Sequence, residues 1–98
     1  MIKHTVVFKL KYPGGSKEAG NFFAAAAQLA NIPGVENFES LKQVSKKNNY
    51  DFCLSMQFEN QELYNAYNIH PSHVAFIQQY WLASVADFME LDYEALDK

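Results

Sequence analysis

The first ten residues of the chain alternate between apolar and polar side chains. Ile2, His4, Val6, Phe8 and Leu10 fall on one face of an extended chain, and the lysine, threonine and valine residues between them fall on the other. A period of two is typical of a β-strand with one buried face. We therefore expect a strand that turns His4 and its apolar neighbours toward a core.

The pattern then changes to that of a helix. Residues 13–15 (PGG) break the strand, and Ser16 is suited to cap a helix over residues 17–31. Pro33 and Gly34 cannot continue this helix and end it. The helix has a broad apolar stripe, which consists of Phe22, Phe23, Ala26, Ala27, Leu29 and Ala30.

Two further strands follow, joined by a short polar turn. Residues 35–45 alternate imperfectly, which indicates a β-bulge, whereas residues 50–59 alternate cleanly between apolar and polar side chains. The turn at residues 46–49 (KKNN) is short enough to predict that the two strands form a hairpin.

The last third of the chain predicts two helices and a strand. Asn60 is expected to cap a short helix over residues 61–68, and a break follows at Ile69 and His70. Pro71 is favourable as the first residue of a second helix, which should extend to about Ala83. Residues 85–95 alternate again and predict the final strand.

The resulting order, β-α-β-β-α-β, predicts an α+β fold of the ferredoxin-like type, with a four-stranded antiparallel sheet and its helices on one face. We treat residues 1–98 as a single domain, since the chain is long enough for only one two-layer core. The other sheet face carries apolar residues such as Val7. A partly apolar uncovered face needs a partner, and the simplest one is a second copy, so we expect a homodimer through this open face.

Composition excludes several partners. The net charge is −3 and the longest basic cluster is Lys46-Lys47, so nucleic-acid binding is not expected. No apolar run is long enough to span a membrane, and lysines interrupt the N-terminal apolar stretch, so we expect a cytoplasmic protein without a signal peptide. The single cysteine, Cys53, rules out an internal disulfide and a cysteine-based zinc site.

Four stretches of the chain carry a resemblance to a known family: "IKHTVVFKLK", "IPGVENFESLKQVS", "YDFCLSMQFENQELYNAYNIHPSHVAFIQQYW" and "LDYEA". With these stretches in this order, the chain resembles the stress-responsive α/β-barrel (Dabb) proteins of the dimeric α+β barrel superfamily. The His-Pro-x-His step and the Asp-Tyr pair of the last strand are its specific features. The resemblance implies a homodimer in which two sheets face each other.

One plant branch of this family is enzymatic. It closes a linear polyketide thioester by intramolecular aldol condensation, without cofactor or metal, in a pocket between the sheet and the helices of each subunit. Its working residues are a histidine of the first strand, a tyrosine before the His-Pro-x-His step and the second histidine of that step. By resemblance these are His4, Tyr67 and His73. The aromatic residues expected to line such a pocket are Phe8, Phe23 and Phe76.

Each polar candidate also has a structural interpretation. His4 is either a hydrogen-bonded core histidine or a pocket residue. His73, near a helix N-terminus, should stay neutral and can serve as a general base, or it merely satisfies free backbone groups. Tyr67 can bind a carbonyl oxygen with its hydroxyl or simply pack its ring. His70 precedes a proline and is expected to cap the helix.

Metal binding is disfavoured by the spacing of the histidines. His70 and His73 are separated by a proline break, and no carboxylate completes a recognised zinc motif, so we expect no metal and no cofactor. The acidic residues of the last strand, Glu90, Asp92 and Glu94, share one face. They are expected to form a solvated edge or ion pairs across the dimer, with the lysines Lys3, Lys9 and Lys42.

Three functions stay open at this point. The first is a homodimer with a small-molecule pocket that performs cofactor-independent cyclase or lyase chemistry on a carbonyl or aromatic compound. In this case His73 is the general base, and Tyr67 and His4 orient or polarise the carbonyl. The second is a non-catalytic, stress-associated structural dimer. The third is a cofactor-free monooxygenase, which no residue of the chain specifically selects.

Overall fold

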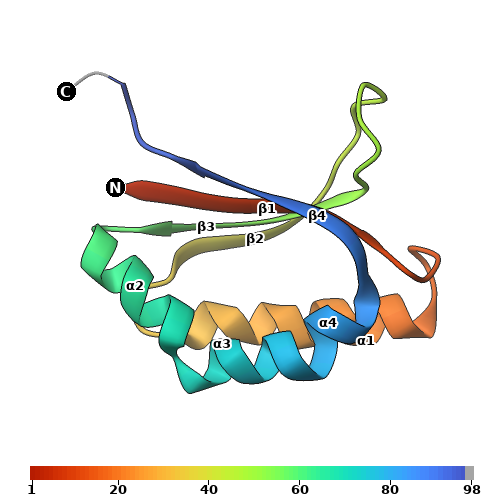
Figure 1. Ribbon diagram of the computed structural model, residues 1–98, viewed down its shortest axis with the longest axis horizontal. Helices are drawn as coiled ribbons and strands as arrows, with labels where there is room; N and C mark the ends of the chain where they lie inside the picture. Colours follow the sequence, from red (N-terminus) through yellow and green to blue (C-terminus); the bar gives the residue numbers. More distant parts are fainter. Residues whose placement is uncertain (97–98) are drawn as a thin grey trace.

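The computed structural model describes residues 1–96, and it confirms the ferredoxin-like α+β fold (Figure 1). Its elements in chain order are β1 (Ile2–Leu10), α1 (Lys17–Ala27), η1 (Gln28–Asn31), β2 (Glu36–Lys42), β3 (Phe52–Phe58), α2 (Gln61–Ile69), α3 (Pro71–Phe76), η2 (Ile77–Trp81), α4 (Leu82–Ser84) and β4 (Val85–Tyr93).

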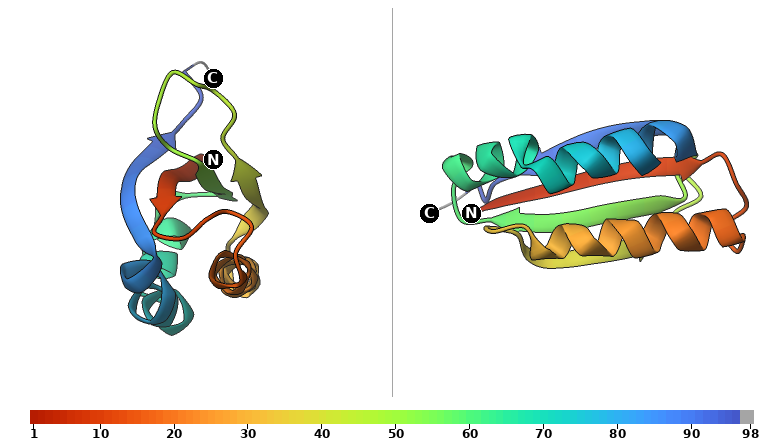
Figure 2. Two further views of the ribbon diagram at one scale, coloured as in Figure 1. Left: turned by 90° about the vertical axis from the view of Figure 1, so that its right-hand side faces the viewer. Right: turned by 90° about the horizontal axis from the view of Figure 1, so that it is seen from below.

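The four strands form one antiparallel sheet in the order β2-β3-β1-β4. All helices lie on one face of it, and the other face is uncovered (Figure 1). In the view from below, α1 lies in front of β2 and β3, and the helical arm formed by α2, α3, η2 and α4 lies in front of β1 and β4 (Figure 2). The space enclosed by the second arm and the sheet is where the candidate site lies.

Strand register decides which side chains meet under the helices. His4 pairs with Met56 of β3 and with Asp92 of β4, and Val6 pairs with Glu90. Directly paired residues of antiparallel strands turn their side chains to the same face. The carboxylates of Glu90 and Asp92 therefore lie on the helix side of the sheet, together with His4.

The helix starts follow the caps expected from the sequence. The Ser16 hydroxyl accepts a hydrogen bond from the Ala19 backbone N–H, and the Asn60 side chain accepts one from Leu63. His70 is extended and its Nδ1 accepts from the Ser72 backbone N–H at 3.1 Å. Each of these side chains satisfies one of the free donors at a helix start, so His70 acts as a joint between α2 and α3.

Element ends differ from the predicted ones by local chemistry. The first helix stops at Ala27 and continues as the 3-10 turn η1, and the helix expected from Pro71 to Ala83 contains a π-helical turn, η2. The predicted bulge is present, because the β2–β3 register slips between Glu36 and Glu39. The strands end before the predicted hairpin turn, at Lys42 and Phe52, and in the loop between them the Gln43 side chain donates to the Tyr50 carbonyl at 2.6 Å.

The core between helices and sheet is aromatic. Phe8 is fully buried, and its ring centroid lies 5.2–6.2 Å from those of Phe22, Phe23, Phe52 and Trp81. Rings at this separation interact favourably beyond the area they bury. This cluster fills the space between helices and sheet next to the cavity.

The uncovered face is partly apolar. Leu41, Met89 and Tyr93 are 42%, 45% and 52% exposed there, and Val7 is half-buried beside them. Within residues 1–96, no helix is both long and apolar enough to cross a membrane.

Candidate functional site: a cavity between sheet and helices

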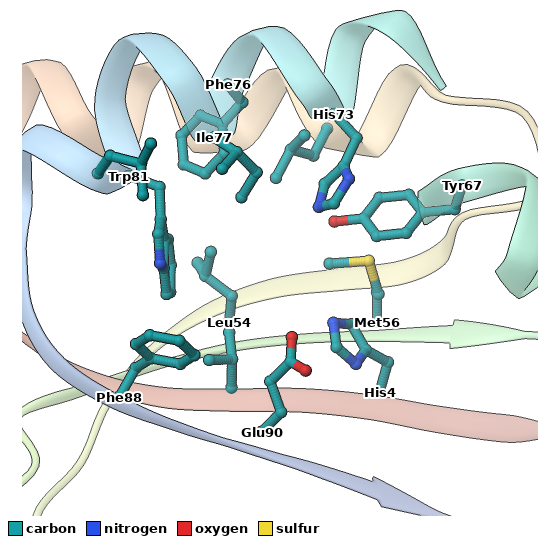
Figure 3. Close-up of a pocket in the computed structure, with 13 residues that line it drawn as sticks. His4, Leu54, Met56, Tyr67, His73, Phe76, Ile77, Trp81, Phe88 and Glu90 are labelled. Atoms are coloured by element: carbon teal, nitrogen blue, oxygen red, sulfur yellow. The ribbon is translucent and has the colours of Figure 1, made fainter. Parts of the chain in front are cut away.

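A cavity of about 250 Å³ lies between the sheet and the arm formed by α2, α3, η2 and α4 (Figure 3). Its lining consists of His4, Val6, Leu29, Leu54, Met56, Tyr67, His73, Phe76, Ile77, Trp81, Leu82, Phe88 and Glu90. Most of these are apolar. Sites for drug-sized ligands occupy roughly 300–1,000 Å³, so this space suits a small molecule.

The cavity has a polar end and an apolar end. Figure 3 shows His4, Tyr67, His73 and Glu90 turned toward one another, with Trp81 and Phe88 on the opposite side. The π-helical turn η2 contributes Ile77 and Trp81 to the wall. Such wide turns occur often at functional sites, and this one shapes the apolar end.

His4 is buried and held by two neighbours. Its Nδ1 lies 2.7 Å from Asp92 Oδ1 and 2.8 Å from the Tyr64 hydroxyl, which itself donates to Asp92 Oδ2 at 2.8 Å. Because a carboxylate only accepts hydrogen bonds, Nδ1 carries the imidazole proton. In the neutral ring the other nitrogen, Nε2, is an acceptor, and His4 is among the residues that line the cavity.

Tyr67 presents its hydroxyl to the cavity. Only 2% of the residue is exposed, and its ring packs on Phe58 and, at a centroid distance of 4.4 Å, on His73. Burial and the Glu90 charge raise the pKa of Tyr67, so its hydroxyl stays protonated and can donate. In the described part of the chain this hydroxyl has no hydrogen-bond partner, although every fully buried side-chain nitrogen or oxygen has one. The hydroxyl is therefore accessible from the cavity.

His73 is oriented by the backbone. Its Nδ1 donates to the Asn68 carbonyl at 3.1 Å, which leaves Nε2 with a free lone pair. Burial lowers the pKa of His73 below its ordinary value of 6.5, and the bond to Asn68 only partly opposes this effect. A neutral imidazole with one free nitrogen in an apolar space is chemically suited to accept a proton.

The cavity thus brings together His4 from β1, Tyr67 from α2 and His73 from α3, the three residues expected from the resemblance. Phe76 lines it as well. Phe8 and Phe23 do not line it: both belong to the aromatic core cluster, because they lie at the end of the sheet filled by Phe22 and Phe52.

Three contributors were missed at the sequence level. Asp92 and Glu90 are exposed on the edge strand, as expected for a solvated edge, but the sequence did not show that Asp92 binds His4 and that Glu90 lines the cavity. Within the chain, Lys9 pairs with Asp51 at 3.4 Å, and the ion pairs expected across a dimer stay a prediction. Tyr64, three residues before Tyr67 on the same helix face, holds the His4–Asp92 pair. That i, i+3 spacing is the sequence signal that would have linked the two tyrosines.

Metal-ligating side chains do not gather in this structure. Across residues 1–96, no group of three or more histidine, cysteine, aspartate or glutamate side chains is placed to hold a metal ion.

Fold and cavity together define a class: a ferredoxin-like α+β protein with a mainly apolar pocket and three converging acid–base side chains. The family model of the stress-responsive A/B barrel domain (Dabb) matches residues 2–95. The chain is 33% identical to olivetolic acid cyclase of Cannabis sativa over 79 residues, which cover 76% of this chain and 78% of the cyclase. The chain belongs to the Dabb family.

Solved structures agree with this assignment. A Dabb protein from Mesorhizobium loti with a ferredoxin-like fold is 45% identical, with a TM-score of 0.94 over 98% of this chain and 97% of its own. A dimeric ferredoxin-like protein from Thermobifida fusca is 22% identical, with a TM-score of 0.79 over 96% of this chain and 90% of its own. The second likeness concerns the fold alone.

Proposed function

We propose that this Dabb protein binds a small carbonyl-containing or aromatic compound in the cavity and acts on it without a cofactor, as a cyclase or lyase. The observation that carries the proposal is the meeting of His4, Tyr67 and His73, from three separate elements, at one end of an otherwise apolar space. A filled structural core would have no accessible hydroxyl such as that of Tyr67. The one-third identity to olivetolic acid cyclase supports the same class of chemistry.

The three side chains divide the work by their protonation. His73 Nε2, neutral and free, takes a proton from the carbon next to the substrate carbonyl. The electron pair left behind moves onto the carbonyl oxygen, where the Tyr67 hydroxyl donates a hydrogen bond to the developing enolate. The resulting carbon nucleophile can then attack a second carbonyl of the same molecule.

His4 has a different part in the reaction. Because Asp92 and Tyr64 hold its Nδ1, Nε2 of the neutral ring accepts rather than donates. It is therefore suited to hold a hydroxyl or enol proton of the bound molecule and not to polarise a carbonyl. Asp92 and Tyr64 act as positioning residues that fix the ring of His4.

Assembly as a homodimer through the open sheet face is part of the proposal. The exposed apolar residues Leu41, Met89 and Tyr93 support it, and so does the dimeric state of the Thermobifida fusca protein with the same fold. Pairing two such faces would remove this surface from water. The helix-side cavity would stay accessible in each subunit, because it lies on the opposite side of the sheet.

Proton abstraction is testable without knowing the natural substrate. A β-keto thioester with a short alkyl tail is incubated in D₂O at low buffer concentration, and exchange of its α-protons is followed by NMR. We expect the protein to accelerate exchange and His73→Gln to remove most of the acceleration, by about 10²-fold or more. Exchange that proceeds equally with the variant, or at the background rate with both proteins, would contradict the assignment of His73.

A separate assay tests the monooxygenase interpretation. Oxygen uptake with quinol substrates, measured on the same preparation, would favour it over the cyclase or lyase. We expect no uptake, because the proposed aldol-type bond formation consumes no oxygen.

A further inference from the structure

Glu90 is a titratable residue of the cavity lining that the proposed chemistry does not use. It lies on β4 opposite Val6, and β4 is the edge strand of the sheet. Its side chain is exposed and nevertheless turns toward His4 and Tyr67 at the mouth of the cavity (Figure 3). In the part of the chain that the structure describes, no hydrogen bond or ion pair occupies this carboxylate.

The polar end of the cavity is rich in acceptors. Nε2 of a neutral His4, His73 Nε2 and the Glu90 carboxylate accept hydrogen bonds, and among the lining residues of the described chain Tyr67 supplies the single hydroxyl donor. A ligand that satisfies these groups has to bring several donors of its own. An unmatched acceptor that loses its water on binding weakens the complex.

The charge of the site also limits the kind of ligand that it can bind. No lysine or arginine is among the residues that line the cavity within the described chain, whereas Glu90 lines it and Asp92 lies directly behind His4. Burial keeps His73 neutral, so it does not offset these carboxylates near pH 7. An anionic head group would meet a negative potential with no fixed cation to balance it.

We propose that Glu90 selects the ligand: the cavity takes molecules whose head group is neutral and carries two or more hydroxyl donors, such as a dihydroxyphenyl ring, and rejects those that end in a carboxylate. Glu90 accepts one hydroxyl, and His4 accepts another, while an alkyl or other apolar part extends toward Trp81 and Phe88. This inference rests on the proposed function, because it concerns the same cavity.

Two probes with the same tail separate the effect of charge from that of apolar contact. Hexylresorcinol has a neutral head with two hydroxyl groups. The other probe, 4-hexylbenzoate, carries the same tail on a ring that ends in a carboxylate. Their affinities are measured by calorimetry at neutral pH for the unmodified protein, for Glu90→Gln, and for Glu94→Gln. Glu94 follows β4 outside the cavity lining, so its variant loses the same charge away from the site.

We expect the unmodified protein to bind hexylresorcinol more tightly than 4-hexylbenzoate. Glu90→Gln should reduce the ratio of the two dissociation constants by about 3- to 10-fold, because it binds 4-hexylbenzoate more tightly. Glu94→Gln should leave it nearly unchanged. If both probes bind and Glu90→Gln keeps the full preference, the role of Glu90 is refuted while the pocket stands. If neither probe binds to the unmodified protein, the proposed binding function fails with it.

Discussion

Tyr64 and Tyr67 form a matched pair in which substitution by Phe should affect stability at one position and ligand binding at the other. Both lie on α2, both rings pack on Phe58 at centroid distances of 5.0 and 5.1 Å, and both are at least nine-tenths buried. They differ in their hydroxyl groups. The Tyr64 hydroxyl contacts His4 and donates to Asp92, each at 2.8 Å, whereas the Tyr67 hydroxyl faces the cavity.

The expected magnitudes follow from these contacts. A hydrogen bond to a charged group contributes about 1.5–3 kcal/mol, and the Asp92 side chain is 41% exposed, so the Tyr64 bond should lie near the lower limit. Tyr64→Phe should therefore lower the free energy of unfolding by about 1–2 kcal/mol. Tyr67→Phe removes a hydroxyl that bonds nothing in the described protein, and its free energy of unfolding should change by less than about 0.5 kcal/mol.

Urea unfolding at neutral pH, with all proteins at one concentration, measures this difference, since the stability of a dimer depends on concentration. Binding of hexylresorcinol provides the second readout. Tyr67→Phe should weaken it by about 2- to 10-fold through loss of one hydrogen bond, at unchanged stability. If Tyr67→Phe instead destabilises the protein as much as Tyr64→Phe and leaves binding intact, the hydroxyl is structural and the reasoning fails.

Further substitutions test the core, the titration of His73 and the dimer face. Phe8→Ala should lower the free energy of unfolding by about 3–5 kcal/mol, because it opens a hole in a fully buried aromatic cluster; a loss below about 1 kcal/mol in urea unfolding would contradict the packing. The pKa of His73 is lowered in the folded state, so the unfolded chain binds the proton more readily and stability should fall as the pH drops below about 6.5. His73→Gln should reduce this slope in unfolding experiments over that pH range, and an unchanged slope would count against it. Met89→Lys should halve the mass measured by light scattering if the open face is the interface, whereas a retained dimer would place the interface elsewhere.

The fold was predictable because each element carries its own local signal. The alternation from Ile2 to Leu10 marks β1, the side chains of Ser16 and Asn60 mark helix starts, and Pro71 marks the start of α3. The same alternation places His4 on the helix side, which is the part of the site that depends on local pattern alone.

The rest of the site depends on long-range geometry. Asp92 meets His4 only through the register between β1 and β4, which joins residues 88 positions apart, and no local pattern encodes that register. Alternation also predicts on which face of the strand a side chain lies, but it does not predict which part of that face borders a cavity. Phe8 therefore shares a face with His4 but lies in the filled core, and the cavity lies farther along the strand.

A crystal structure of the protein with hexylresorcinol tests the central claim most directly, namely that the cavity between sheet and helices is a ligand site. We expect the ring between His4, Tyr67 and His73, with a hydroxyl group within hydrogen-bond distance of Tyr67 or Glu90 and the tail against Trp81 and Phe88. A ligand bound only at the open sheet face, or a cavity closed by repacked side chains at saturating ligand, would contradict it.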